Sequence, residues 1–268
     1  MKTRIISAIV LIVLFVPILI IGKVPYIVLG SVLSLMGLWE LLRLKKVPLF
    51  MQIISYIFCL FIVISSFIIK DFNPFNYYLL VGMFLLYSII MLVNSDLSKY
   101  SYQDCLWLFI VTIIIGFMFK NFIDVRVVDS LKLGSASNLF TVIYLFLISV
   151  MTDTFALFCG KAFGKHKLIP KVSPNKTIEG SIGGSIIGTI IPVVFIYLVT
   201  KDISVLFVVE TFILTIISQF GDLFFSSIKR NHDIKDFSNL IPGHGGILDR
   251  LDSILFVVNA YIIMINIL

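Results

Sequence analysis

The sequence predicts an all-α, polytopic integral membrane protein with about nine transmembrane helices. Of its 268 residues, 59% are hydrophobic and only 13% are charged, whereas a soluble domain has about 45–50% apolar and about 25% charged residues. The mean hydropathy is +1.10. The apolar residues gather in runs of about 20, the length that a helix needs to cross a bilayer.

Nine apolar runs are candidate membrane-spanning helices, and short connections join most of them. They cover residues 4–22, 25–42, 49–69, 77–94, 106–123, 138–159, 182–200, 203–221 and 247–268. The first run follows a basic start, as a secretory signal does, but it lacks a small-x-small cleavage site and further apolar runs follow at once. We therefore expect it to be retained as the first span.

The distribution of positive charge predicts the side of the membrane that each connection occupies. With a cytoplasmic N-terminus, the outer segments hold few of the 21 lysines and arginines, namely Lys23, Lys70, Lys120, Arg126, Lys132 and Lys201. All the others lie on cytoplasmic segments, as the positive-inside rule expects. Both long polar connections, near residues 160–181 and 222–252, are then cytoplasmic. We predict a multi-pass protein of the cell inner (plasma) membrane with a cytoplasm-facing active-site cavity.

The two halves of the chain differ in their polar content. Residues 1–135 have few charges within apolar spans, so we expect transmembrane helices that serve as a scaffold or as a packing surface for another subunit, as in a homodimer. Residues 136–268 hold the chemically dense segments and are predicted to be the catalytic transmembrane region. Basic residues near anionic lipid explain the net charge of +6 without nucleic acid. The three single cysteines fit neither a disulfide framework nor a zinc site.

The first dense segment, residues 153–184, begins with Asp153 inside an apolar span. A carboxylate at such a position normally faces a partner or a water-filled cavity. The run SPNKTIEG starts with a turn or helix-start signal at Ser173. Lys176 and Thr177 can hold phosphate oxygens. The lysines here fit a loop that faces lipid headgroups equally well, so a phosphate site and a lipid-facing loop both stay open.

The second dense segment, residues 221–253, places acids, a hydroxyl and a base on one helical face. If the helix continues past Asp222, the i, i+4, i+7, i+11 stripe comprises Asp222, Ser226, Lys229 and Asp233. Asp249 and Asp252 can share a face at the start of the last helix, whose N-terminus attracts anions. Carboxylates for a hard cation and bases for phosphates favour phosphoryl or nucleotidyl transfer. The structural alternatives are a solvated loop with weak ion pairs and a salt-bridge cluster at a helix start.

Residues 226–252, SSIKRNHDIKDFSNLIPGHGGILDRLD, resemble the signature of the phosphatidate cytidylyltransferases, or CDP-diacylglycerol synthases. Every specified position of that signature is met, at Ser226, Lys229, Arg230, Lys235, Asp236, Ser238, Pro242, Gly243, His244, Gly245, Gly246, Asp249, Arg250 and Asp252. The segments around Asp153, residues 173–180 and Gly221–Asp222 also resemble that family. The first half matches it only in hydropathy.

The resemblance implies transfer of CMP from CTP to phosphatidic acid, with Mg²⁺ as cofactor and a second cation left open. The acyl chains would enter from the lipid bilayer. It implies Asp222 and Asp249 as metal ligands. The residues implied for catalysis are Lys229, Arg230, His244, Arg250 and Asp252. Those implied for substrate binding are Ser173, Lys176, Thr177, Ser226, Gly243, Gly245 and Gly246.

Two other functions stay open from the sequence. One is a related membrane cytidylyltransferase or lipid kinase that acts on an isoprenoid or ether-linked phosphate. The other is a transporter for a phosphorylated anion, with Asp153, Glu210 and Asp222 as intramembrane charges. Transporters often have paired repeats in their two halves. The polar residues here are confined to one half and one face, which disfavours a transporter.

Overall fold

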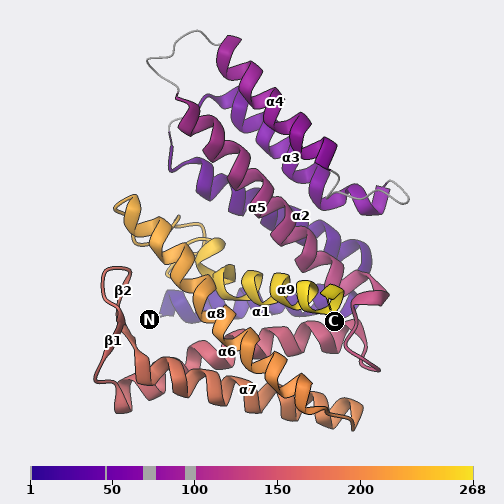
Figure 1. Cartoon of the computed structure of the whole chain (residues 1–268), viewed down its shortest axis with the longest axis vertical. Coiled ribbons are helices and arrows are strands. Elements are labelled where there is room, and N and C mark those ends of the chain that lie inside the picture. The colour runs from indigo at the N-terminus through magenta and orange to yellow at the C-terminus, as the bar shows by residue number, and fades with distance from the viewer. Residues whose placement is uncertain (1, 46, 69–76, 94–100, 268) are drawn as a thin grey trace. The chain divides into compact units, whose positions relative to one another are not determined.

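The computed structural model describes residues 2–45, 47–68, 77–93 and 101–267. In this part of the chain it contains nine α-helices, one 3-10 turn and two short strands (Figure 1). The helices are α1 (Lys2–Ile21), α2 (Lys23–Leu42), α3 (Leu49–Ile68), α4 (Tyr77–Val93), α5 (Tyr102–Val127), α6 (Asn138–Phe163), α7 (Ile178–Thr200), α8 (Val205–Asn231) and α9 (Leu248–Ile267). The turn η1 covers Asp129–Leu131, and the strands are β1 (Lys167–Ile169) and β2 (Ser173–Thr177).

Each of the nine predicted spans coincides with one helix, so the all-α prediction is confirmed. Within the described residues, five helices are long and apolar enough to cross a membrane: α2, α5, α6, α7 and α8. The total number of spans stays a prediction. The predicted span ends at residues 69, 94 and 268, and the topology residues Lys46, Lys70 and Lys99, lie outside the described residues.

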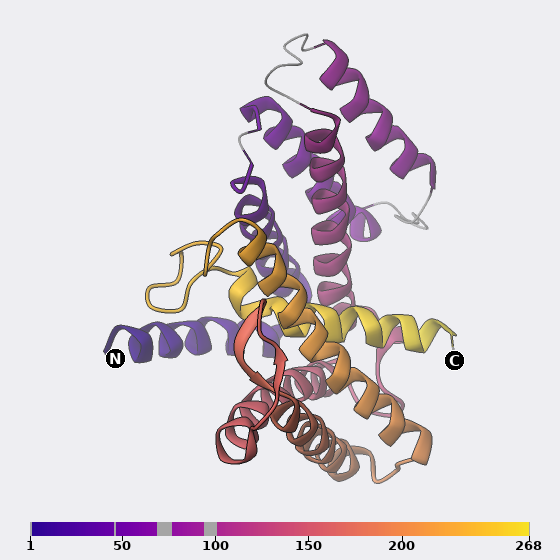
Figure 2. The same ribbon diagram turned by 60° about the vertical axis from the view of Figure 1, so that its left-hand side comes forward.

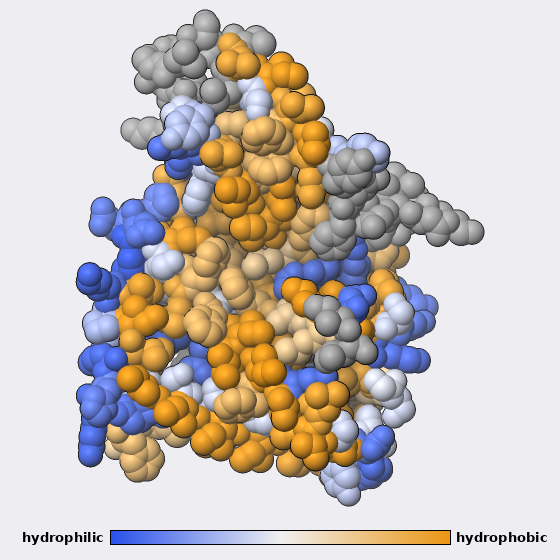
Figure 3. All heavy atoms as spheres, viewed as in Figure 1, coloured by the Kyte–Doolittle hydropathy of each residue, from blue (hydrophilic) through white to orange (hydrophobic). Residues whose placement is uncertain are grey.

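Exposed apolar side chains explain why these helices belong in a membrane. On α7, Ile182, Ile186 and Ile190 are each about half exposed and lie four residues apart, so they share one helical face. Figure 3 shows apolar residues over much of the visible surface. Such broad apolar exposure is unfavourable in water but suits a lipid environment, and the chain is a multi-pass membrane protein.

The chain forms two compact units. One consists of residues 1–23 and 121–268, and the other of residues 24–120, with α5 contributing to both. The first helix is thus grouped with the C-terminal helices rather than with its sequence neighbours. The predicted division at residue 135, between a scaffold part and a catalytic part, stays a prediction.

In the unit of residues 1–23 and 121–268, α6 and α7 pack along each other (Figure 1). Glycines make this close packing possible. A Cβ atom at Gly184 would lie 2.7 Å from the Thr152 carbonyl oxygen, and one at Gly188 would lie 2.3 Å from the Thr152 Oγ1. The opposite face of α7 carries the exposed isoleucines. Helix α8 packs against α7 and α9, which completes the helical frame of this unit (Figure 2).

Helix α1 joins the same unit through its C-terminal half. The guanidinium of Arg126 donates from Nε to the Leu19 carbonyl (2.8 Å) and from Nη2 to the Ile20 carbonyl (2.9 Å). These carbonyls are at the end of α1, where backbone acceptors lack intrahelical partners. The ring of Phe15 packs edge-on against Phe146 of α6, with centroids 5.4 Å apart. Both contacts join segments more than 100 residues apart.

A short antiparallel hairpin connects α6 to α7. Strand β1 pairs with β2, with Lys167 opposite Thr177. The prediction that Ser173 begins a turn or helix is wrong, because it begins β2. The helix starts after Thr177, whose Oγ1 accepts the Gly180 N–H at 3.1 Å as an N-cap. Glu179, in the first turn of α7, accepts a hydrogen bond from the Lys165 N–H at 3.0 Å. This bond attaches the segment just before β1 to the start of α7.

The unit of residues 24–120 contains polar groups that satisfy one another. The Tyr87 hydroxyl lies 2.7 Å from Ser55 Oγ and 3.3 Å from Thr112 Oγ1, and all three side chains are buried. At the helix ends, Lys45 Nζ lies 2.9 Å from Asp104 Oδ1. These contacts hold α2, α3, α4 and α5 together at specific points.

Candidate active site

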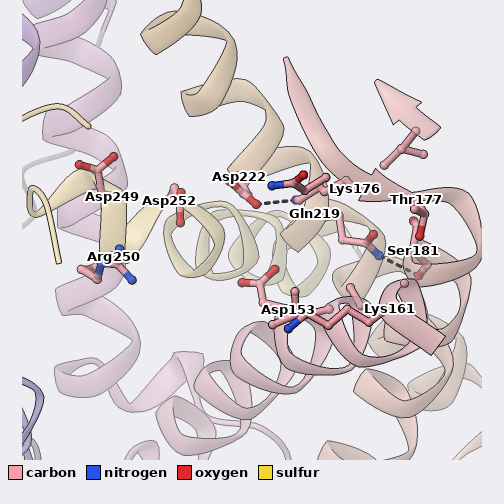
Figure 4. Close-up of a pocket in the computed structure, with 15 residues that line it drawn as sticks. Asp153, Lys161, Lys176, Thr177, Ser181, Gln219, Asp222, Asp249, Arg250 and Asp252 are labelled. Carbon is pink, nitrogen blue, oxygen red and sulfur yellow. Dashed lines mark hydrogen bonds and ion pairs between the residues drawn. The ribbon is translucent and has the colours of Figure 1, made fainter. Parts of the chain in front are cut away.

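The C-terminal halves of α6 and α8, the start of α9 and the β2–α7 junction enclose a cavity of about 680 Å³ (Figure 4). Within the described residues, its charged lining consists of Asp153, Lys161, Lys176, Asp222, Asp249, Arg250 and Asp252. The polar lining adds Asn175, Thr177, Ser181 and Gln219, and the apolar lining Ala156, Leu157, Gly160 and Leu168. The cavity therefore combines carboxylates, cations and an apolar side.

Three carboxylates from three different helices meet in this cavity. Asp153 comes from α6, Asp222 from α8 and Asp252 from α9. Asp222 and Asp252 each interact electrostatically with Asp153, and they also interact with each other. Keeping like charges close together is unfavourable unless a cation lies among them or nearby. Positive charge is therefore required beside these three carboxylates.

A lysine from the hairpin supplies part of the positive charge. Lys176 of β2 forms an ion pair with Asp222 Oδ2 (Figure 4), and it also interacts with Asp153. Ser226, one turn further along α8, donates its hydroxyl to Asp222 Oδ1 at 3.2 Å. Both oxygens of Asp222 thus have polar partners, and the hairpin is attached to the helix that carries it.

Asp249 organises the segment that leads into α9. Its Oδ1 accepts a hydrogen bond from Lys229 Nζ (2.7 Å). Its Oδ2 accepts hydrogen bonds from the backbone N–H groups of Phe237 (2.9 Å) and Gly246 (2.8 Å). The side chains of Lys229 and Asp249 are only 9% and 3% exposed. A Cβ atom at Gly245, where φ is +89°, would lie 2.9 Å from Asp249 Oδ2. The glycine run therefore lets the backbone wrap closely around this carboxylate.

A second polar cavity of about 420 Å³ adjoins the same segment. Its lining within the described residues is Lys235, Asp236, Asn239, Gly243, His244, Gly245 and Arg250. Arg250 lines both cavities, and its Nε donates to the His244 carbonyl at 2.9 Å. The PGHGG turn is thereby attached to the start of α9.

The structure separates the predicted site residues into three groups. Those that line the first cavity are Lys176, Thr177, Asp222, Asp249, Arg250 and Asp252, and those that line the second are Gly243, His244, Gly245 and Arg250. Ser173, Ser226, Lys229, Arg230 and Gly246 line neither of these two cavities. Three of them contact lining residues: Ser226 donates to Asp222, and Lys229 and the Gly246 N–H donate to Asp249. Arg230 instead donates to the Val172 and Ile234 carbonyls, at 3.3 and 2.9 Å.

The predicted helical face of Asp222, Ser226, Lys229 and Asp233 is wrong at one position, Asp233. Helix α8 does continue past Asp222, so Asp222, Ser226 and Lys229 share a helix. It ends at Asn231, however, and Asp233 lies beyond it with φ at 54°. The left-handed backbone at Asp233 removes it from the face that the spacing predicted.

The sequence analysis expected Asp153 to face a partner or a cavity, and it lines the first cavity; Lys161, Ser181 and Gln219, which also line it, were missed. Gln219 Nε2 donates to Ser185 Oγ at 2.8 Å and so links α8 to α7. A signal was available, because an acid or an amide within an apolar span usually faces a partner or a cavity. Lys161 gave no such signal, since a lysine at a helix end normally faces headgroups.

Comparison with known proteins identifies the family of the chain. A sequence model of the cytidylyltransferase family matches residues 2–268. The chain belongs to this family. It is 35% identical over 260 residues to the phosphatidate cytidylyltransferases of Staphylococcus haemolyticus (strain JCSC1435) and Staphylococcus aureus (strain COL), covering 96% of both chains in each case. It is 33% identical to the phosphatidate cytidylyltransferase of Bacillus subtilis (strain 168), over 96% of this chain and 94% of that protein.

The donor set of this cytidylyltransferase fits Mg²⁺. Four carboxylates line the first cavity, and carboxylate oxygens are the ligands that a hard cation prefers. Within the described residues, no group of three histidine, cysteine or acidic side chains is close enough to form a complete metal cage. That is compatible with Mg²⁺, which one or two carboxylates commonly hold together with water and substrate phosphate oxygens.

Proposed function

We propose that this protein is a phosphatidate cytidylyltransferase. It transfers CMP from CTP to phosphatidic acid and releases CDP-diacylglycerol and pyrophosphate. The observation that carries the proposal is the first cavity, where four carboxylates and three cationic side chains adjoin apolar residues in a member of the cytidylyltransferase family. The relatives named above as phosphatidate cytidylyltransferases share at least 33% identity with nearly the whole chain.

The reaction requires positioning rather than a strong base. The phosphate monoester of phosphatidate has a second pKa near 6, by analogy with phosphorylated side chains, so its oxygen is already a nucleophile at neutral pH. This oxygen attacks the α-phosphorus of CTP in line. The bond between the α-phosphorus and the oxygen that bridges to the β-phosphate breaks, and pyrophosphate leaves with that electron pair. The protein has to align two anionic substrates and neutralise their charge.

Basic residues of the first cavity are suited to hold the phosphates. Lys176, Lys161 and Arg250 enter from β2, α6 and α9, so they approach the cavity from different sides. Arg250 also lines the second cavity, where the backbone at Gly243 (φ 76°) and Gly245 (φ 89°) has the left-handed conformation. N–H groups in such a turn can approach a phosphate closely. We assign the tail of the triphosphate to this side.

The carboxylates are suited to hold Mg²⁺, and we propose Asp222 and Asp249 as its ligands, with Asp252 and Asp153 beside them. When bound, the cation would neutralise charge on the phosphates. Asp222 would have to share its Oδ2 with Lys176 or release that lysine to the substrate. Asp249 already binds Lys229 and two backbone N–H groups, so its role as a ligand would depend on its remaining lone pairs. A second cation fits the excess of carboxylates.

The apolar part of the cavity lining is suited to the diacylglycerol chains. Ala156, Leu157 and Leu168 lie beside the charged groups, and Leu157 is 54% exposed. We propose that phosphatidate enters from the bilayer while CTP enters from the cytoplasm. The positive-inside rule supports a plasma-membrane protein with its N-terminus and active site on the cytoplasmic side. The unit of residues 24–120 offers apolar surface for a homodimer.

The test is product identification with purified protein in detergent. Incubation with α-labelled CTP, Mg²⁺ and dipalmitoyl phosphatidate should give labelled CDP-diacylglycerol and an equal amount of pyrophosphate. Diacylglycerol, which lacks the phosphate nucleophile, should give neither product. Pyrophosphate release with an isoprenoid phosphate but not with phosphatidate would move the acceptor to another lipid. No release with any acceptor would overturn the enzyme assignment.

The metal assignment has its own test. Treatment with EDTA should abolish turnover, and added Mg²⁺ should restore it. Asp249→Ala should lose Mg²⁺-dependent turnover while it keeps its helical circular dichroism. If folded Asp249→Ala turned over CTP as the wild type does, Asp249 would not be a metal ligand.

A further inference from the structure

The first helix reaches the PGHGG turn, although 237 residues separate the two in the sequence. Ser7 Oγ of α1 lies 2.8 Å from the Nδ1 atom of His244 and 3.1 Å from the carbonyl oxygen of Pro242. Ser7 and His244 are both half-buried and belong to the same compact unit. Figure 2 shows the long connection before α9 next to the N-terminal half of α1.

Two of the contacts of Ser7, to Pro242 and to His244, bear on the position of the hydrogen on the His244 ring. A carbonyl oxygen can only accept a hydrogen bond, so the Ser7 hydroxyl donates its single hydrogen to Pro242. The Ser7 oxygen then offers lone pairs to Nδ1, which must carry a hydrogen to complete the bond. This arrangement favours the Nδ1–H tautomer of the neutral His244 ring, in which Nε2 is unprotonated.

We propose that Ser7 is a positioning residue for His244: it fixes the imidazole in the Nδ1–H form and leaves Nε2 to exchange a proton with substrate. The catalytic consequence rests on the proposed cytidylyltransferase function. Ser7 makes no contact with substrate in this proposal. It acts through the ring and through the carbonyl of the turn that carries it.

The arrangement lets His244 gain and lose a proton without moving. In the imidazolium both nitrogens carry hydrogen, so the bond from Nδ1–H to Ser7 is the same as in the neutral ring. An Nε2–H that gives its proton to a departing pyrophosphate oxygen leaves the neutral Nδ1–H ring behind. The charged residues that line the cavity with His244 are Lys235, Asp236 and Arg250. Two of them are cationic, which favours an anionic group there.

The tautomer can be measured without any activity. The chain has only three histidines, so ¹⁵N-histidine labelling gives three rings, which His→Gln variants assign. At about pH 8, where an ordinary imidazole is neutral, the ¹⁵N shifts of His244 should show a protonated Nδ1 and an unprotonated Nε2. Ser7→Ala should give a mixture of tautomers, and Ser7→Thr, which keeps the hydroxyl, should restore the single form. A wild-type Nε2–H tautomer, or one that Ser7→Ala leaves unchanged, would overturn the proposal.

A double-mutant cycle tests the catalytic consequence. Ser7→Ala should lower kcat for CTP turnover about 3- to 10-fold with little change in KM, as expected when one neutral hydrogen bond that acts in the transition state is lost. In a His244→Ala background, Ser7→Ala should have little further effect. Ser227→Ala is the matched control, since that hydroxyl donates to Phe224 of its own helix at 2.7 Å.

The outcomes separate the two proposals. Equal effects of Ser7→Ala in the wild-type and His244→Ala backgrounds would mean that Ser7 only holds the Pro242 carbonyl, and the positioning role would be rejected. A wild-type protein that does not use CTP and phosphatidate would overturn the proposed function. In that case the ¹⁵N measurement would still decide whether Ser7 fixes the ring.

Discussion

The two compact units differ in how their polar side chains interact. In residues 24–120, Tyr87, Ser55 and Thr112 bond one another, and Lys45 faces Asp104. In the other unit, the carboxylates of Asp153, Asp222 and Asp252 lie close together and repel one another. The comparison teaches that buried hydroxyls which bond one another indicate packing, whereas several like charges gathered at a cavity indicate a functional site.

The largest effect on stability is expected where the functional unit does contain a buried pair. Lys229→Met would leave Asp249 buried with only neutral N–H donors, and breaking a buried ion pair costs about 3–5 kcal/mol. We expect a clear fall in the thermal midpoint of the purified protein. The same change at exposed Lys171 in the hairpin is the control. Adding Asp249→Asn to Lys229→Met should recover part of the loss, and no recovery would argue against the pair.

The second-largest predicted effect is a loss of catalytic activity with little loss of stability. Asp222→Asn keeps the shape of the side chain but removes a charge from the carboxylate group, so we expect kcat/KM to fall about 100- to 1,000-fold, as for other groups that stabilise charge during transfer. The thermal midpoint should change little, because the hydrogen bond from Ser226 can be kept and the lost ion pair with Lys176 is offset by less repulsion from Asp153 and Asp252. Asp202→Asn, at an exposed position between α7 and α8, should have wild-type turnover. Equal turnover in both variants would contradict a role for Asp222.

A smaller effect on stability is expected for glycine-to-alanine changes, and it should differ between the two units. Gly184→Ala places a methyl group against the Thr152 carbonyl and should destabilise the α6–α7 contact by about 1–3 kcal/mol. Gly82→Ala in α4 meets nothing within 4 Å among the described residues, and alanine favours a helix, so no loss is expected. Thermal midpoints in the same detergent measure both. A greater loss for Gly82→Ala would contradict the close α6–α7 packing.

The smallest effect is predicted for the hydroxyl network of residues 24–120. Tyr87→Phe removes the contacts with Ser55 and Thr112 but keeps the ring, and a hydrogen bond in a membrane protein contributes about 0.6 kcal/mol on average. The thermal midpoint should fall slightly and CTP turnover should stay at the wild-type level. A large loss of turnover would give this unit a catalytic role that its paired polar groups do not suggest.

The helices could be predicted from the sequence because span length is a strong physical constraint. About 20 apolar residues in a row leave few alternatives in a bilayer, and all nine runs are helices. The hairpin could not be predicted, since β1 has only three residues and its pairing depends on Glu179 and Thr177 at the start of α7. The end of α8 could not be predicted either, because the spacing of Asp233 is as helical as that of Lys229.

The site could be predicted in composition but not in geometry. The resemblance implied site roles for Asp222, Arg250 and Asp252, and all three line the first cavity; their roles stay a prediction. It could not show that Lys229 and Asp249 bind each other, since their separation in the chain contains a turn of unknown course. Nor could it connect Ser7 with His244, because a serine in an apolar helix has no pattern that names a distant partner.

The contact between α1 and the PGHGG turn also has a consequence for biosynthesis. At a translation rate of about 5–20 residues per second, His244 is made on the order of 10–50 s after Ser7. During that interval the first helix lacks the segment that its serine contacts. The compact unit that holds α1 and the PGHGG turn is therefore complete only after α9, the last helix, has been made.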